Sequence, residues 1–292
     1  MFEDMADLIS IVKKENLPMH EIILNEESLT TGRSHKEILD RAQHSLDIML
    51  QSLEKGNTLD IDLPIKEVIE QSQHMMGAPI FIGKDLKEAI YWAMSIMEYS
   101  NGMGVICACP TAGSSGIFPA VIFKAQQMLD KSNEDVLHAF LVGATVGAII
   151  GNLASLSGSE AGCQAEVGVA SAMAGSAIAY MAGGSPDQIG QVVALTLKNL
   201  LGLVCDPVAG LVISPCIKRN AIGVMNAFLA AEMALSGVTS IIPADEVIEA
   251  MMKVGRKLPE DLRETGNGGL AASPTGKRIQ RQIFGSKDDK NY

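Results

Sequence analysis

The chain has 292 residues, 47% of them hydrophobic, and this length and composition exclude a wholly disordered protein. Aromatic residues make up only 4%, whereas glycine (28) and methionine (16) are plentiful, which favours close-packed helices over a β-sandwich. The formal net charge of −11 argues against nucleic acid or an anionic membrane surface as a partner.

The first ten residues carry acidic side chains where an export signal would need a basic region followed by an apolar one. We therefore expect a cytoplasmic protein with reduced cysteines, and the odd number of cysteines, 5, disfavours a full disulfide framework. Metal binding, catalysis and simple burial remain open as roles for these thiols.

The first eighty or so residues are polar and predict amphipathic helices. Ser34 and Glu37 have the spacing of a capping box, which opens a helix that runs to about Gly56. Apolar residues recur on one face of this helix at helical spacing, as at Ile38, Ala42 and Leu46. We interpret this helix as scaffold.

From Lys84 onward the chain becomes more apolar and richer in glycine. Ser132 and Asp135 form a second capping signal before a long apolar helix, and Ser185 with Pro186 marks the start of another. Further helices are expected over 84–100, 117–131, about 222–236 and, after Pro243, as far as Gly255. No period-2 strand pattern and no internal repeat is found.

The pattern therefore predicts a mainly α fold with apolar helices at its centre. We expect one domain over 1–275, made of a polar helical part (1–80) and an apolar, cysteine-bearing core (81–275), followed by a charged tail over 276–292.

One segment has an alternative interpretation. Residues 139–156 are largely apolar, and Gly143, Gly147 and Gly151 form the small-residue ladder found in membrane helices. The segment contains Thr145 and Asn152 and has no aromatic or basic girdle at its ends. We therefore favour a buried helix of a non-membrane protein, with a helical membrane protein as the alternative.

Three stretches bring reactive side chains and glycines into this apolar half, and they span 109–120, 157–168 and 205–216. They contain no Cys-x-x-Cys pair, so the spacing is not that of a zinc site, and Cys107 with Cys109 is ambiguous as a joint ligand pair. Cys163, Cys205 and Cys216 would give a centre with three thiolate ligands and one open position, as catalytic metal sites have. Buried structural cysteine is the alternative.

These stretches carry a resemblance to a known family. The segments SGSEAGCQAEVGVASAMA, GLVCDPVAGLVISPCIKRNA and PTAGSSGIFPAV resemble the α-subunit of bacterial iron–sulfur L-serine dehydratases, and the resemblance extends over nearly the whole chain. It implies a 4Fe-4S cluster held by Cys163, Cys205 and Cys216, with the fourth iron free of cysteine and facing L-serine. It also implies a separate β-subunit, hence a hetero-oligomer.

The chain departs from the single-chain members of that family in two respects. No β-like domain precedes the α-like part, so a partner chain is expected, and the sequence ends GSKDDKNY without the terminal cysteine that some members have. The tail therefore lacks the cysteine that would supply a resting-state ligand in those members.

The reaction that the resemblance implies removes the Cα proton and the Cβ hydroxyl of L-serine. The resulting enamine tautomerises to an imine, which water hydrolyses to pyruvate and ammonium. A Lewis-acidic iron would stabilise the departing hydroxide, so no pyridoxal phosphate is expected. Another 4Fe-4S hydro-lyase of a small hydroxy acid is the alternative within enzymes.

Candidate residues for this chemistry cluster near the cysteines. Ser114, Ser115 and Gly116 precede a helix and could bind a carboxylate or serve as an ordinary cap. Arg219 and Asn220 could bind the same carboxylate or merely close a loop. The general base is not identified: the candidates are Glu160, Glu166 and Asp206, for each of which a structural role is the favoured alternative, and the base could also come from the β-subunit.

Overall fold

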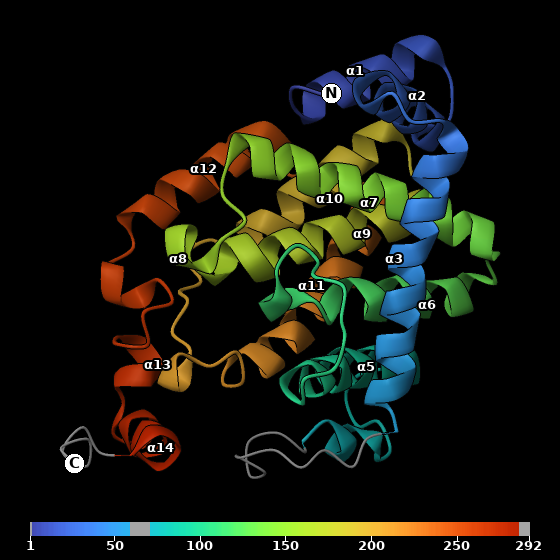
Figure 1. Cartoon of the computed structure of the whole chain (residues 1–292). Coiled ribbons are helices and arrows are strands. Elements are labelled where there is room, and N and C mark those ends of the chain that lie inside the picture. Colours follow the sequence, from blue (N-terminus) through green and yellow to red (C-terminus); the bar gives the residue numbers. More distant parts are fainter. Residues whose placement is uncertain (1, 59–70, 286–292) are drawn as a thin grey trace.

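The computed structural model describes residues 2–58 and 71–285 of the chain (Figure 1). Every regular element in these two ranges is a helix, and the β-type pairing is limited to one isolated bridge between Cys205 and Arg263. The predicted mainly α fold is therefore confirmed.

Within the two described ranges the helices are mostly joined by short connections. They are α1 (Met5–Glu15), α2 (Met19–Thr31), α3 (His35–Gly56), η1 (Ser72–Met76), α5 (Lys84–Asn101), η2 (Ala112–Ser114), α6 (Ile117–Leu129), α7 (Asn133–Leu153), α8 (Gly158–Ala161), η3 (Gln164–Gly168), α9 (Val169–Met181), α10 (Pro186–Asn199), η4 (Val208–Gly210), α11 (Cys216–Leu235), α12 (Ala244–Lys257), η5 (Glu260–Leu262), α13 (Gly269–Ala272) and α14 (Pro274–Phe284).

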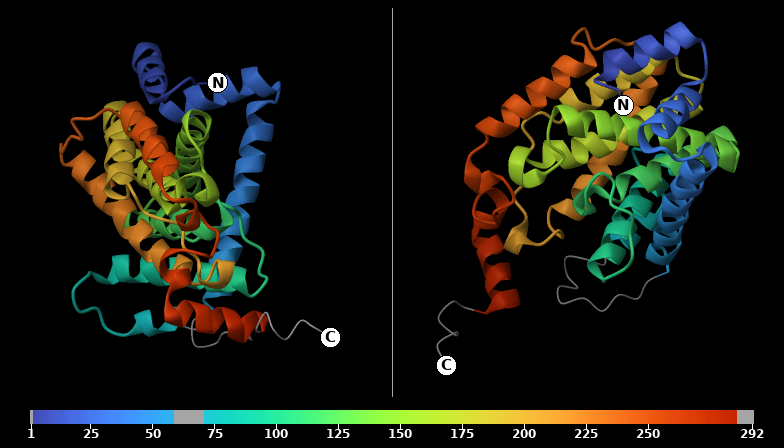
Figure 2. Two further views of the ribbon diagram at one scale, coloured as in Figure 1. Left: turned by 90° about the vertical axis from the view of Figure 1, so that its left-hand side faces the viewer. Right: turned by 45° about the horizontal axis from the view of Figure 1, so that its top comes forward.

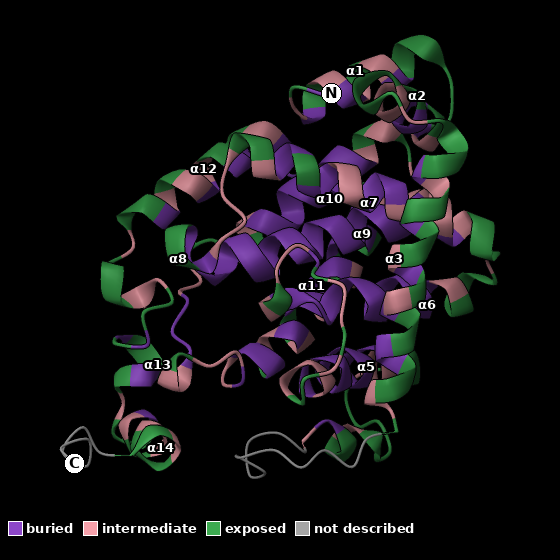
Figure 3. Ribbon diagram, viewed as in Figure 1, coloured by how far each residue is buried: buried purple, intermediate pink, exposed green. Residues whose placement is uncertain are grey.

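Helix α9 lies at the centre of the core and is buried along nearly its whole length (Figure 3). It packs against α7, α10, α11 and α6. Glycine makes the close contact between α7 and α9 possible, because a Cβ on Gly143 of α7 would lie 2.8 Å from the carbonyl oxygen of Met173 in α9. A Cβ on Gly147 would lie 2.7 Å from the sulfur of Met173. The glycine ladder of α7 thus brings two core helices together.

Among the described residues, α7 is the one helix that is long and apolar enough to cross a membrane by length and composition. Half of its most apolar stretch is buried inside the protein, with Val142 and Val146 fully buried. In this fold α7 is therefore a core helix that packs against α9.

The capping signals that the sequence predicts are present. The hydroxyls of Ser34, Ser132 and Ser185 each accept a hydrogen bond from the third helical residue, and each forms a complete capping box. Helix α3 runs along the side of the core, while α1 and α2 cover one end of it (Figures 1 and 2).

The C-terminal helices differ from expectation in two places. Helix α11 begins at Cys216, earlier than the predicted start near residue 222. Part of the segment expected as a charged tail forms α14, which starts at Pro274 after the capping residue Ser273. Helices α1 and α14 lie at opposite ends of the molecule (Figure 2). The division into a domain and a tail stays a prediction.

Candidate metal centre

Cys163 is positioned by an irregular turn in front of α9. The preceding Gly162 has φ +79°, and a Cβ there would lie 2.7 Å from the carbonyl oxygen of Leu203, so glycine is required. After Cys163 the chain forms a π-helical turn (Gln164–Gly168) that leads into α9. Such π turns are rare and frequently occur at functional sites. The turn holds Cys163 in the interior, with only 2% of the residue exposed.

Cys205 is held by a segment that comes from near the C-terminus. Its N–H donates to the carbonyl of Leu262 at 2.9 Å, and its carbonyl accepts from the N–H of Glu264 at 2.7 Å. Cys216 is the first residue of α11, and both thiols are buried. Three parts of the chain, far apart in sequence, thus place the three predicted cysteines in one region.

Two of these thiols and one carboxylate form a tight group. The Sγ atoms of Cys163 and Cys205 and a carboxylate oxygen of Glu166 all lie within 4.8 Å of one another. Glu166 Oε2 is 3.8 Å from the Cys163 sulfur and 3.7 Å from the Cys205 sulfur. Cys216 lines a cavity of about 340 Å³ together with Cys205 and Glu166. Sulfur and carboxylate oxygen are both metal ligands, so this donor set is compatible with a metal cofactor.

The electrostatics of the group single out Cys163 as the thiol that ionises first. A hydrogen bond from the Cys205 thiol lowers the pKa of Cys163, and the charge of Arg219 acts in the same direction. The same bond and burial raise the pKa of Cys205, and burial raises the pKa of Cys216 to about 12. Because metal ligands must be deprotonated, the lowered pKa makes Cys163 the thiol of this group that most easily becomes a ligand.

Glu166 is fixed at the wall of the cavity. The hydroxyl of Thr111 donates to its Oε1 at 2.7 Å, and burial raises the pKa of the carboxyl group. A Cβ on Gly158 would lie 2.6 Å from Glu166 Oε2 and 2.9 Å from the Cys205 sulfur. The glycine therefore allows the backbone of α8 to approach both groups.

The other two candidate carboxylates lie in different surroundings. Asp206 forms an ion pair with Arg219 at 2.8 Å and accepts the N–H of Leu270 at 2.8 Å, so both carboxylate oxygens are engaged. Glu160 is exposed on α8 and does not line the cavity. Of the three, Glu166 alone lines the cavity.

Arg219 and Asn220 both interact with the cysteine loops. Besides Asp206, the Arg219 guanidinium donates to the Cys163 sulfur at 3.5 Å and to the carbonyl of Val204 at 2.8 Å. The amide of Asn220 donates to the carbonyls of Gly113 and Cys216, both at 2.9 Å. Both side chains therefore tie the loops around the site to one another.

The predicted carboxylate-binding loop lies beside the cavity with its hydroxyls turned into the protein. Ser114 donates to the carbonyl of Cys109 at 3.2 Å and Ser115 to that of Ala112 at 2.8 Å, and both residues are almost fully buried. The Gly116 N–H donates to Asn220 Oδ1 at 3.2 Å. Substrate binding by these residues stays a prediction. The cavity itself is lined by the preceding residues, 111–113.

Thr111 and Glu264 are among the residues of the cavity wall that the sequence analysis missed. Thr111 lies within the glycine-rich stretch, but its contact with Glu166, 55 residues away, leaves no signal in the sequence. Glu264 lines the cavity and has a φ of +64°, a backbone conformation that a glutamate rarely adopts. No sequence pattern predicts this conformation.

The fold and the site together define a helical protein with a thiol-rich, metal-compatible centre at the edge of its core. A family model described as "Serine dehydratase alpha chain" matches residues 14–271. The chain belongs to this family.

The chain is also similar to individual members of the family. It is 42% identical to "Probable L-serine dehydratase, alpha chain" of Bacillus subtilis (strain 168), with 98% of this chain and 96% of the relative covered. It is 38% identical to "L-serine dehydratase, alpha chain" of Peptoniphilus asaccharolyticus, covering 99% and 100%. Identity to "L-serine dehydratase 1" of Escherichia coli (strain K12) is 34%, over 82% of this chain and 55% of that protein.

Proposed function

We propose that this chain is the α-subunit of a cytoplasmic L-serine dehydratase, a lyase that converts L-serine to pyruvate and ammonia. The observation that carries the proposal is the convergence of Cys163, Cys205 and Glu166 within 4.8 Å beside a cavity that also contains Cys216. The names of relatives similar over nearly their whole length support the substrate and the reaction.

The cofactor we propose is a 4Fe-4S cluster held by Cys163, Cys205 and Cys216. The donor set fits this group, because the sulfurs of two of these residues open onto a cavity of about 340 Å³ and the third lies beside them. When bound, the cluster would supply an iron that acts as a Lewis acid toward the leaving hydroxyl group of the substrate.

The side chains around the cavity would bind and orient the substrate and move its proton. Glu166 is the best supported of the three base candidates, because it lines the cavity and its raised pKa brings it closer to that of a neutral-pH proton acceptor. The Thr111 hydroxyl would hold the carboxylate in position. Asp206 would act indirectly, by orienting Arg219 toward Cys163.

The loop over 111–116, which carries the predicted substrate-binding residues, would contribute to the site by its fixed position beside the cavity. Asn220 links Gly113 to Cys216, so the loop over 111–116 and the start of α11 are held at a fixed separation. We propose that this loop forms the wall against which the substrate carboxylate lies, with Ser114, Ser115 and Gly116 shaping its turn.

The partner we propose is a separate β-subunit. The chain covers 55% of the length of "L-serine dehydratase 1" of Escherichia coli, whereas it covers 96% and 100% of two relatives named as alpha chains. A second chain would then correspond to the part of the longer relative that this chain does not match.

The test is anaerobic purification followed by iron and sulfide quantitation, and pyruvate formation from L-serine and L-threonine with the β-chain present. Cys163→Ser should lose cluster iron and activity together. The matched control is Cys107→Ser, because Cys107 is partly exposed and does not line the cavity. Colourless protein that is fully active, or equal iron in both variants, would contradict the proposal.

A further inference from the structure

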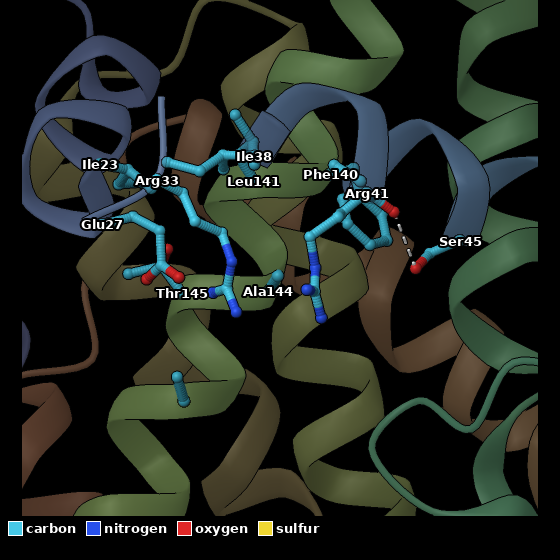
Figure 4. A pocket seen from close by; sticks show the side chains of 12 residues that line it. Ile23, Glu27, Arg33, Ile38, Arg41, Ser45, Phe140, Leu141, Ala144 and Thr145 are labelled. Atoms are coloured by element: carbon cyan, nitrogen blue, oxygen red, sulfur yellow. Dashed lines mark hydrogen bonds between the residues drawn. The ribbon is translucent and has the colours of Figure 1, made fainter. Parts of the chain in front are cut away.

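A second cavity, of about 300 Å³, lies between α2, α3 and α7 (Figure 4). It shares no lining residue with the cavity of the candidate metal centre. Its volume is at the lower end of the range typical of small-molecule sites. The proposed dehydratase reaction makes no use of it.

Two arginines reach into this cavity without side-chain partners. Figure 4 shows the side chains of Arg33 and Arg41 extending in the same direction in this view, and both residues line the cavity together with Ala144 of α7. Within the ranges that the structure describes, neither guanidinium forms a hydrogen bond or an ion pair. Two such groups in one cavity are suited to binding an anion, because the planar guanidinium matches the two oxygens of a carboxylate.

The remaining lining adds two further kinds of contact. Glu27 also lines the cavity, drawn on the side of Arg33 away from Arg41 in the view of Figure 4, and among the described residues it forms no ion pair with either arginine. The aliphatic and aromatic side chains of Phe140 and Leu141 provide an apolar wall. The cavity therefore combines two guanidinium groups, one carboxylate and an apolar wall.

We propose that this cavity binds an α-amino acid with an apolar side chain. Arg33 and Arg41 bind its carboxylate, Glu27 accepts hydrogen bonds from its ammonium group, and Phe140 and Leu141 pack against its side chain. A dianion is disfavoured because Glu27 would repel it, and a simple amine is disfavoured because it leaves both guanidinium groups without a partner.

The test is isothermal titration calorimetry of the anaerobically prepared full-length chain with L-leucine, which lacks the hydroxyl group that the proposed reaction needs. We expect saturable binding of one molecule per chain. Arg33→Gln and Arg41→Gln should each weaken binding about tenfold or more, because each removes a charge-assisted contact. Arg41→Lys should recover part of the loss, since it keeps the charge without the bidentate geometry.

Two analogues test the individual contacts. Binding of 4-methylpentanoate, which lacks the ammonium group, should be weaker than that of L-leucine, and Glu27→Gln should remove this difference. Binding of 3-methylbutan-1-amine, which lacks the carboxylate, should be undetectable. The control variant is Arg256→Gln, which changes the charge equally on α12 and does not line the cavity; its affinity should be unchanged.

Three results would overturn the proposal. The first is the absence of saturable binding up to about 10 mM L-leucine, beyond the weakest affinities of specific sites. The second is equal binding of inorganic phosphate, which would define a plain anion site. The third is intact leucine binding in Arg33→Gln and Arg41→Gln combined with weaker association with the β-chain, which would make this face a protein-docking surface.

Discussion

The guanidinium of Arg219 donates a hydrogen bond to the sulfur of Cys163 at 3.5 Å. The interaction crosses between two segments 56 residues apart and places a permanent positive charge beside a buried thiol. It therefore links the start of α11 electrostatically to the turn in front of α9.

Removing this charge should make Cys163 harder to ionise. In Arg219→Gln the pKa of Cys163 should rise, because a favourable charge and a hydrogen bond to the thiolate are both lost, although the bond from Cys205 remains. The measurement is a pH titration of thiolate absorbance in iron-free protein, where the first step should move to higher pH. Cys163→Ser, as the control, should lack that step. An unmoved first step in Arg219→Gln would contradict the assignment.

Breaking the ion pair behind this arginine should destabilise the fold. Asp206 and Arg219 pair at 2.8 Å with side-chain exposures of only 4% and 12%, so Asp206→Asn leaves a nearly buried charge without its partner. We expect the free energy of unfolding to fall by about 3 kcal/mol in urea denaturation.

The matched control for Asp206 is a pair on the surface. Glu249 and Lys253 lie 2.6 Å apart with side-chain exposures of 66% and 65%. Glu249→Gln should therefore cost less than about 1 kcal/mol. Equal losses in the two variants would show that the Asp206 pair has no special role in stability.

The contact between α7 and α9 should not tolerate even a methyl group at Gly143. An added Cβ would lie 2.6 Å from the Phe118 ring and 2.8 Å from a backbone oxygen of Met173. Gly143→Ala should lower the free energy of unfolding by about 1–2 kcal/mol, because overpacking outweighs the gain in helix propensity.

The comparison variant for this contact is Gly77→Ala, where a Cβ would meet nothing within 4 Å and φ is −60°. Its stability in urea should stay within about 0.5 kcal/mol of the parent. A neutral Gly143→Ala would mean that α7 can move away from α9 at little cost.

The stacked pair of His20 and His138 should make stability sensitive to acid. The two rings lie 3.7 Å apart, and His20 Nδ1 is 2.7 Å from the Tyr180 hydroxyl. Burial, and then the charge of His138, lower the pKa of His20 below its ordinary value of 6.5, although Glu21 and Glu134 oppose this shift.

The sign of the acid effect follows from proton binding. Below pH 6.5 the unfolded chain takes up a proton at His20 before the folded chain does. The contribution of neutral His20 to the free energy of unfolding is therefore fully present above this pH and is lost as the pH decreases. Urea denaturation at pH 7.5 and about pH 5.5 should therefore show a smaller acid loss in His20→Gln than in the parent. Identical losses would contradict the prediction.

Local signals in the sequence were sufficient for much of the fold. The capping residues Ser34, Ser132 and Ser185 predicted helix starts correctly because a cap depends on residues only three positions apart. The same kind of signal at Ser273 and Pro274 was available for α14, yet the charged composition of that segment was given more weight.

The site was predictable only in part, because it is assembled from distant segments. The three glycine- and cysteine-rich stretches could be recognised as unusual, and residues of all three line the cavity of the candidate metal centre. The wall residues Thr111 and Glu264 could not be assigned, since they reach the cavity through loops whose path depends on tertiary contacts. Likewise the sequence could not show that Asp206 pairs with Arg219 whereas Glu166 faces the cavity.

The π turn over Gln164–Gly168 has a consequence for how this chain can change in length. A π turn accommodates one residue more than an α-helical turn, so deleting one residue there would let α9 continue backward as a regular α-helix. Each residue of an α-helix turns the chain by about 100°, so Cys163 would be rotated away from Cys205 with no change in its chemistry. The number of residues in this turn therefore matters to the position of Cys163 as well as the identity of Glu166 within it.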